Sequence, residues 1–189
     1  MITNKDYLSS IRKCYLFDGI EDKKLTEAIM LLNGRIRKIQ KDEFIVRLGD
    51  ELQSAGLLLK GRIESSFQNE SFDQITMHRF GGGYLFGEAL VINDTKNSPV
   101  QVRAVEECTI LFIDLKAIYL SEETSPLRLK LAENLINFLS VKFAVVIIMA
   151  RGSPSVSTPI CSFIPEVFFP HHNPCFGLYP HFGRFLNLR

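Results

Sequence analysis

The residues best suited to hold a small molecule lie between positions 86 and 105, in the stretch FGEALVINDTKNSPVQVRAV. A tight Phe86-Gly87-Glu88 turn opens this stretch, and an alternating segment from Val100 to Ala104 closes it. A glycine that permits a sharp turn, an acid and a following helical turn are together typical of a small-molecule site. Glu88 has two possible roles: it could bind a ligand, or it could cap the local turn by accepting backbone hydrogen bonds.

The overall composition is that of an ordinary globular protein. The chain has 189 residues, of which 46% are hydrophobic, enough for one domain with an appendage. Its net charge of +1 gives no general bias toward nucleic acid or membranes. The N-terminus does not resemble a signal peptide, and the longest apolar run, residues 143–150, is too short to span a bilayer. The four cysteines are widely spaced, which excludes common zinc and redox motifs and suits a reducing cytoplasm.

Residues 151–189 differ from the rest of the chain. This tail holds six of the eight prolines, three of the four histidines and six of the fifteen phenylalanines. It could be a loosely packed extension, or a metal-binding appendage that uses His171, His172, His181 and Cys175. We favour a third interpretation, a shifted reading frame, because the charge pattern of the preceding helix already stops near Val141. Adjacent histidines in a proline-rich loop do not match zinc-ligand spacing, so no metal site is expected.

Short alternating segments predict a mainly β fold. Two amphipathic helices come first, around Leu8–Tyr15 and Leu25–Leu32. The expected strands are residues 36–39, 44–48, 55–60, 63–67, 74–80, 100–104 and 109–113, separated by glycine- and asparagine-containing turns. Strands of this length and spacing indicate a β-barrel or jelly roll.

A long helix is expected to follow this β domain. Asp114 can cap a short helix, and Ser125-Pro126 then supplies a cap and a proline at the first helical position. The apolar stripe of this helix consists of Leu131, Leu135, Phe138 and Leu139. The stripe either packs back on the β domain or forms a two-fold seam between two chains, and we expect the dimer.

Four short motifs in this order resemble the sensor domain of the Crp/Fnr family of bacterial transcription regulators: Gly49-Asp50, Gly61-Arg62-Ile63, Phe86-Gly87-Glu88-Ala89-Leu90 and Val102-Arg103-Ala104. The resemblance covers residues 5 to about 140. It implies a double-stranded β-helix (jelly-roll) domain of the cyclic-nucleotide-binding type in residues 1–124, flanked by short N-terminal helices. It also implies a long dimerisation helix in residues 125–150, which in the family leads to a winged helix-turn-helix domain.

The resemblance also assigns roles within residues 86–100, which we call the cassette. In cAMP-binding members the glutamate bonds a ribose hydroxyl, backbone N–H groups face the cyclic phosphate, and an arginine followed by serine or threonine completes the phosphate grip. The last two positions fall on Ser98 and Pro99, so the arginine is missing. Lys96 is the nearby cation. The candidate ligand-binding residues are Phe86, Gly87, Glu88, Ala89, Leu90, Ser98, Pro99 and Val100.

The missing arginine argues against cAMP as the effector. A charge-assisted hydrogen bond to a buried phosphate contributes about 1.5–3 kcal/mol, so its loss should weaken a cAMP-like ligand about tenfold to a hundredfold. Pro99 also lacks a backbone donor. Of the other polar residues, Arg103 is expected to face solvent or a surface partner. Cys14 and Cys108 are expected to be small buried hydrophobes.

No residue pattern predicts an enzyme, a resident metal or a cofactor. The sequence therefore predicts a cytoplasmic, homodimeric regulator of the Crp/Fnr type. A small-molecule effector would bind in the jelly roll, and the long helix would relay the signal. Residues 151–189 show no helix-turn-helix pattern, so the DNA-binding half is expected to be missing from this chain. The alternative is a stand-alone dimerising ligand-binding module that does not bind DNA.

Overall fold

The computed structural model describes residues 5–68, 74–120 and 123–151. The chain divides into two units, residues 1–141 and 142–189, and the second is described only up to Arg151. The elements are, in order, α1 (Lys5–Lys13), η1 (Tyr15–Phe17), α2 (Asp22–Leu31), β1 (Arg35–Ile39), β2 (Phe44–Val46), β3 (Ala55–Lys60), β4 (Ile63–Gln68), β5 (Gln74–Phe80), β6 (Leu85–Phe86), α3 (Glu88–Ile92), β7 (Val100–Ala104), β8 (Cys108–Ile113), η2 (Leu115–Ile118) and α4 (Pro126–Arg151).

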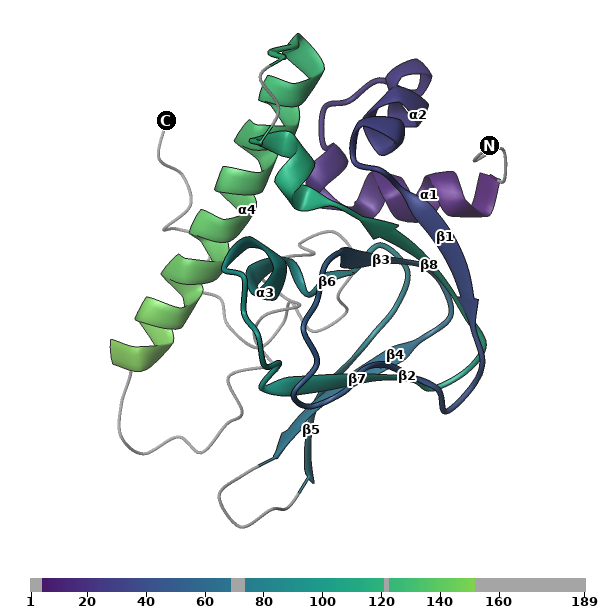
Figure 1. Ribbon diagram of the computed structural model, residues 1–189, viewed down its shortest axis with the longest axis vertical. Helices are drawn as coiled ribbons and strands as arrows, with labels where there is room; N and C mark the ends of the chain where they lie inside the picture. Colours follow the sequence, from purple (N-terminus) through teal and green to yellow (C-terminus); the bar gives the residue numbers. More distant parts are fainter. Residues whose placement is uncertain (1–4, 69–73, 121–122, 152–189) are drawn as a thin grey trace, which may run out of the picture. The chain divides into compact units, whose positions relative to one another are not determined.

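The described strands form two antiparallel sheets (Figure 1). Sheet A has the strand order β1-β8-β3-β6, and sheet B has the order β2-β7-β4-β5. This arrangement confirms the predicted mainly β jelly-roll fold with flanking helices. Each strand predicted from the alternating pattern is present with boundaries that differ by at most two residues. The two-residue strand β6 was not predicted, because two residues are too few to show a period.

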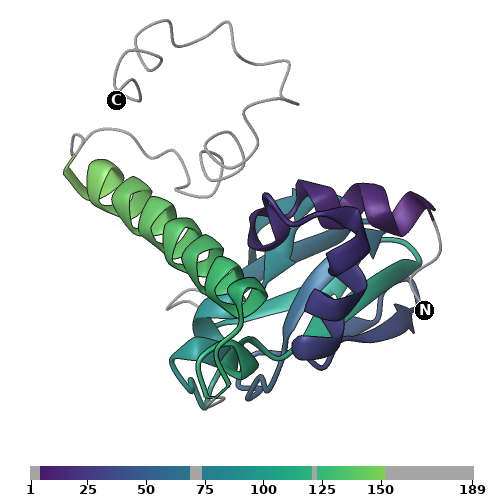
Figure 2. The same cartoon turned by 90° about the horizontal axis from the view of Figure 1, so that it is seen from above.

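Alternation along the strands separates two cores. One face of sheet A packs under the N-terminal helices and α4, and Leu57, Leu59 and Leu111 belong to this first core. Figure 2 shows α1 and α2 lying over one side of the strands. The other face of sheet A meets sheet B in a second core, to which Leu58, Ile110 and Val102 belong. The cassette begins at β6, whose residues Leu85 and Phe86 belong to different cores.

The start of α4 follows the predicted capping pattern. The Ser125 hydroxyl accepts a hydrogen bond from the Arg128 backbone N–H at 3.2 Å, and Pro126 is the first helical residue. Before it, the Asp114 carboxylate caps η2 by accepting from the Lys116 backbone N–H at 3.0 Å. No helix in the described ranges is long and apolar enough to span a membrane.

The apolar stripe of α4 packs on its own chain, which was the alternative to a dimer seam. Leu131 and Leu135 are buried in the first core, and Phe138 and Leu139 are partly buried against it. Asn134 fixes the same face of the helix, since its Nδ2 donates to the carbonyl oxygens of Leu16 at 3.0 Å and Asp18 at 2.8 Å. The periodicity of the stripe showed that this face is covered, but a period cannot tell which surface covers it.

Candidate functional site

The cassette is built around a glycine with a left-handed backbone. Gly87 has φ +76° and directly precedes α3, so it turns the chain from strand β6 into the helix. Glu88 is the first residue of α3 and is 4% exposed. The turn predicted at Phe86-Gly87-Glu88 is therefore present, and it places a carboxylate in a buried position.

Close packing holds the beginning of the cassette in place. The ring of Phe86 lies against Gly56 of the paired strand β3, where an added Cβ would come within 2.2 Å of the ring. Phe86 belongs to the second core. The side chain of Leu52 contacts Gly87, because a Cβ there would lie 2.7 Å from its Cδ2 atom. The start of the cassette is therefore closely packed at two points: a side chain at Gly56 would meet the Phe86 ring, and a side chain at Gly87 would meet Leu52.

The end of the cassette is closed by hydrogen bonds to the loop between β2 and β3. Ser98 is 3% exposed, its backbone N–H donates to Asp50 O at 2.9 Å, and its carbonyl oxygen accepts from the Gly49 N–H at 2.9 Å. The Ser98 hydroxyl donates to Val100 O at 2.6 Å. At the position that the family resemblance gives to the phosphate arginine, this chain therefore has a short neutral side chain engaged with its own backbone.

The nearest cation of the cassette loop is already paired. Lys96 Nζ lies 2.6 Å from Glu51 Oε1, and both side chains are exposed. Hydrogen bonding to Lys96 is the main cause that lowers the pKa of Glu51 below its ordinary value. At the other side of the loop, Asp94 pairs with Lys116 of η2, and this hydrogen bond lowers the pKa of Asp94. Two ion pairs therefore tie the loop to its neighbours, which sequence reasoning did not predict.

The remaining predicted ligand residues differ in exposure. Leu90 and Val100 are half-buried, whereas Ala89 and Pro99 are exposed. Phe86, Glu88 and Ser98 are thus the buried members of the predicted set, and Gly87 is half-buried. Cys14 and Cys108 are buried as expected, and burial raises the pKa of the Cys108 thiol. The histidines and cysteines of the tail lie outside the described residues, and the described part contains no cluster of three or more potential metal ligands.

Gly87→Ala should lower the free energy of unfolding by about 1–3 kcal/mol, because alanine is strained at positive φ and its Cβ would meet Leu52. The matched control is Gly49→Ala, which has the same backbone strain at φ +84° but no atom within 4 Å of the added Cβ. Chemical denaturation of both variants measures the difference. Equal losses of stability would show that the contact between Gly87 and Leu52 has no energetic consequence.

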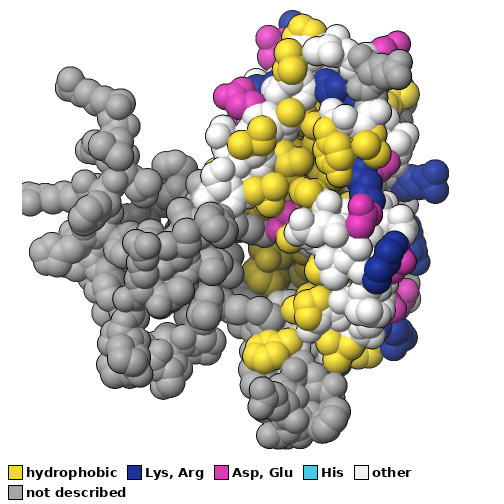
Figure 3. Space-filling view, turned by 60° about the vertical axis from the view of Figure 1, so that its left-hand side comes forward, with side chains coloured by type: hydrophobic (Ala, Val, Ile, Leu, Met, Phe, Trp, Pro, Cys, Tyr) yellow, Lys and Arg dark blue, Asp and Glu magenta, His cyan; other side chains and the backbone are white. Residues whose placement is uncertain are grey.

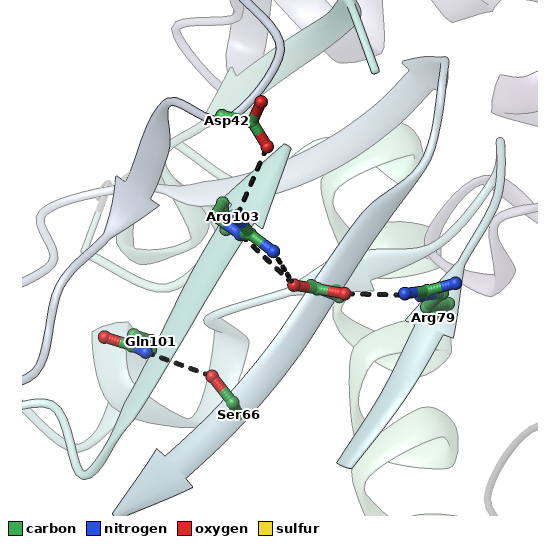
Figure 4. Close-up of polar contacts among 6 residues, drawn as sticks. Asp42, Ser66, Arg79, Gln101 and Arg103 are labelled. Atoms are coloured by element: carbon green, nitrogen blue, oxygen red, sulfur yellow. Dashed lines mark hydrogen bonds and ion pairs between the residues drawn. The ribbon is translucent and has the colours of Figure 1, made fainter. Parts of the chain in front are cut away.

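A second polar cluster lies on sheet B, and sequence reasoning missed it. The Glu64 side chain, 9% exposed, bonds Arg103 Nη2 at 2.5 Å and Arg79 Nε at 3.2 Å, and Arg103 also bonds Asp42 at 3.2 Å (Figure 4). These residues come from β4, β7, β5 and the turn before β2. Register explains the meeting, since Glu64 faces both Arg79 and Arg103 in the sheet. Arg103 therefore reaches a partner within its own chain.

Replacing Glu64 by glutamine should lower the free energy of unfolding near neutral pH, because both guanidinium groups lose a charged acceptor. The expected loss is about 1–2 kcal/mol, since solvent partly screens these ion pairs. The Arg103 hydrogen bond lowers the pKa of Glu64. The stabilisation is therefore present above the unfolded-state pKa, about 4.5, and is lost as the pH falls through the folded-state pKa. Urea unfolding between neutral and acid pH measures it, with Glu51→Gln as the exposed control. Parallel pH profiles for Glu64→Gln and the unmodified chain would contradict the assignment.

Comparison with known proteins identifies the domain to which this geometry belongs. Residues 36–119 match the family model of the cyclic nucleotide-binding domain. No curated protein sequence matches the chain significantly. The matched range contains the whole cassette and both sheets except for Arg35, the first residue of β1.

Solved structures share the fold at low sequence identity. The Thermus thermophilus catabolite activator protein is 22% identical, with a TM-score of 0.62 over 72% of this chain and 61% of that protein. The sensor domain of the transcriptional regulator DNR from Pseudomonas aeruginosa is 16% identical, with a TM-score of 0.55 over 79% of this chain and 93% of that domain. A regulatory subunit of a cAMP-independent protein kinase A from Trypanosoma brucei, as a triple mutant bound to cAMP, is 14% identical with a TM-score of 0.55 over 72% of this chain and 45% of that one.

All three of these proteins are regulatory by name. This chain spans 61% to 65% of the length of three solved proteins that it resembles, including the catabolite activator protein. Residues 36–119 of this chain form a cyclic nucleotide-binding domain, with the jelly-roll fold that is also found in the sensor domains of bacterial transcription regulators.

Proposed function

We propose that this chain is the effector-sensing part of a transcription regulator of the Crp/Fnr type. The observation that carries the proposal is the buried Glu88 directly after the left-handed Gly87, within a cyclic nucleotide-binding domain. A buried carboxylate at the start of a turn can accept hydrogen bonds from hydroxyl groups of a ligand. The fold shared with a catabolite activator protein and with the sensor domain of DNR supports the same role.

The effector in this proposal is a small molecule other than cAMP. Ser98 is neutral, buried and hydrogen-bonded to Val100, Pro99 has no N–H to donate, and Lys96 pairs with Glu51. A cyclic phosphate would therefore find no arginine fork in the cassette. The Trypanosoma brucei structure offers a parallel: the parent protein is named cAMP-independent, and its cAMP-bound mutant carries a threonine-to-arginine change among three substitutions.

The signal would leave the domain through α4, in a homodimer. The face of α4 that the core leaves open carries Leu129, 59% exposed, and Ile136, 64% exposed, seven residues apart. This spacing places both on one side of the helix and fits a seam with a second copy. Figure 3 shows apolar side chains gathered on the side of the molecule where α4 lies in Figure 1. The seam proposed here uses Leu129 and Ile136 in place of the four residues that pack on the core.

A ligand screen by thermal unfolding tests the proposed sensor role. The panel contains cyclic nucleotides, adenosine and small aromatic acids, added to the full chain and to the Glu88→Gln variant. A true effector present at about 100 times its Kd should raise the Tm by about 5–10 °C. The shift should shrink in the Glu88→Gln variant and persist in Glu51→Gln. A ligand that stabilises the Glu88→Gln variant as well as the unmodified chain would place binding outside the cassette.

The second candidate function is a sensor module that does not bind DNA. Its support is the sequence of residues 151–189, which shows no helix-turn-helix pattern. We expect this chain to bind duplex DNA weakly. A titration of labelled duplex DNA at two salt concentrations separates the candidates, because phosphate contacts make affinity steeply salt-dependent. Sequence-specific, salt-sensitive binding in the submicromolar range would support the complete regulator and contradict the module.

A further inference from the structure

Strand β1 carries a concentration of positive charge that no acidic side chain in the described ranges pairs with. Four of its five residues, from Arg35 to Lys38, are exposed. Arg35, Arg37 and Lys38 are cationic, although the net charge of the whole chain is only +1. Among the residues that the structure describes, none of these three forms an ion pair. The acids that flank the paired strand β8 are Glu107 before it and Asp114 after it. Glu107 lies beyond Ile39 in register, and Asp114 lies beyond Arg35 at the other end, where it caps η2.

The same strand forms an edge of sheet A. β1 pairs with β8 on one side, and the strand order places no described strand on its other side (Figure 1). An edge strand presents a row of backbone N–H and C=O groups that can pair with another extended chain. Four consecutive exposed residues leave this strand accessible to a partner.

The side chains of β1 alternate between the two sides of the strand. Ile39 is 1% exposed in the second core, so Arg37 and Arg35, two and four residues before it, lie on the same side of the strand. The Arg37 guanidinium lies over the Phe112 ring, 5.6 Å from its centroid, in a cation–π contact. Ile36, 41% exposed, and Lys38 lie on the opposite side.

We propose that β1 is a docking strand for an acidic, extended segment of a partner protein, which adds to sheet A by β-pairing. The partner would place carboxylates at alternate positions to meet Arg35 and Arg37, and an apolar residue beside Ile36. A nucleic acid could use the cations but not the backbone edge or the exposed Ile36, so the protein segment fits the strand better. Lysine on an edge strand also discourages aggregation. That protective role needs no bound partner, so a binding measurement distinguishes it from docking.

The test uses the full chain and a fluorescent peptide in which glutamate alternates with valine, capped at both ends. Fluorescence anisotropy measures its affinity, and NMR chemical shifts locate the contact. We expect saturable binding with shifts concentrated at residues 34–40. The Arg35→Glu/Arg37→Glu variant should bind about tenfold or more weakly. The matched control Lys23→Glu/Lys24→Glu changes the charge equally on α2 and should leave the affinity within about twofold.

Three results would overturn the proposal. The first is an Arg35→Glu/Arg37→Glu variant that is folded by circular dichroism yet binds the peptide like the unmodified chain. The second is equal binding of a peptide of the same charge in which proline replaces valine, because proline cannot pair along a strand. The third is tighter binding of a single-stranded DNA oligonucleotide than of the peptide, which would mark the strand as a nucleic-acid surface. Loss of peptide binding in Ile36→Asp, with the fold retained, would support the proposal.

Discussion

Leu131→Ala should lower the free energy of unfolding by about 2–5 kcal/mol, the usual cost of removing a fully buried leucine side chain. Leu131 is 0% exposed and lies in the first core with residues of η1, α2 and η2. The loss should be the same at low and high protein concentration, because the contacts that Leu131 makes lie within one chain. Urea unfolding followed by circular dichroism at two concentrations measures it.

The matched control is Ile136→Ala, on the open face of the same helix. Ile136 is 64% exposed, so its truncation should change the stability of the single chain by less than about 0.5 kcal/mol. It should instead weaken self-association in sedimentation experiments if the proposed seam is used. A Leu131→Ala variant of unchanged stability that fails to dimerise would reverse these assignments and restore the stripe of α4 as the dimer seam.

The double variant Ser98→Arg/Pro99→Ala should bind cAMP about tenfold to a hundredfold more tightly than the unmodified chain. The arginine would supply a charge-assisted, two-pronged hydrogen bond to the cyclic phosphate, which contributes about 1.5–3 kcal/mol. Alanine at position 99 would restore a backbone N–H. Isothermal titration calorimetry of both proteins under identical salt measures the gain.

Two further variants separate charge from packing in that experiment. Ser98→Gln/Pro99→Ala introduces a long polar side chain without the charge and should leave cAMP affinity near that of the unmodified chain. Adding Glu88→Gln to the arginine variant should reduce the gain, because the carboxylate accepts from the ribose in the proposed binding mode. A gain of equal size with glutamine at position 98 would exclude the missing cation as the cause of weak cAMP binding.

The sequence was sufficient to predict the features that depend on neighbouring residues. The Phe86-Gly87-Glu88 turn, the caps at Asp114 and Ser125 and the longer strands follow from short-range patterns, and the structure contains them. The buried positions of Cys14 and Cys108 were expected from the residue type, because free cysteine usually behaves as a small buried hydrophobe.

Features that depend on register between distant strands could not be predicted. Arg79 and Arg103 follow Glu64 by 15 and 39 residues along the chain. Only the pairing of β4 with β5 and β7 brings the three side chains together. The pairing of Lys96 with Glu51 spans 45 residues in the same way. A sequence period shows that one face of an element is covered, but it does not identify the covering surface. This limit explains why the stripe of α4 allowed two interpretations.

The most direct measurement is a calorimetric comparison of cAMP with adenosine on the unmodified chain. In the proposed binding mode Glu88 accepts from the ribose and no cassette cation meets the phosphate, so the two ligands should bind with affinities within about threefold of each other. The same comparison on Ser98→Arg/Pro99→Ala should favour cAMP by about tenfold or more. A preference of tenfold or more for cAMP in the unmodified chain would contradict the proposal that this domain has lost phosphate recognition.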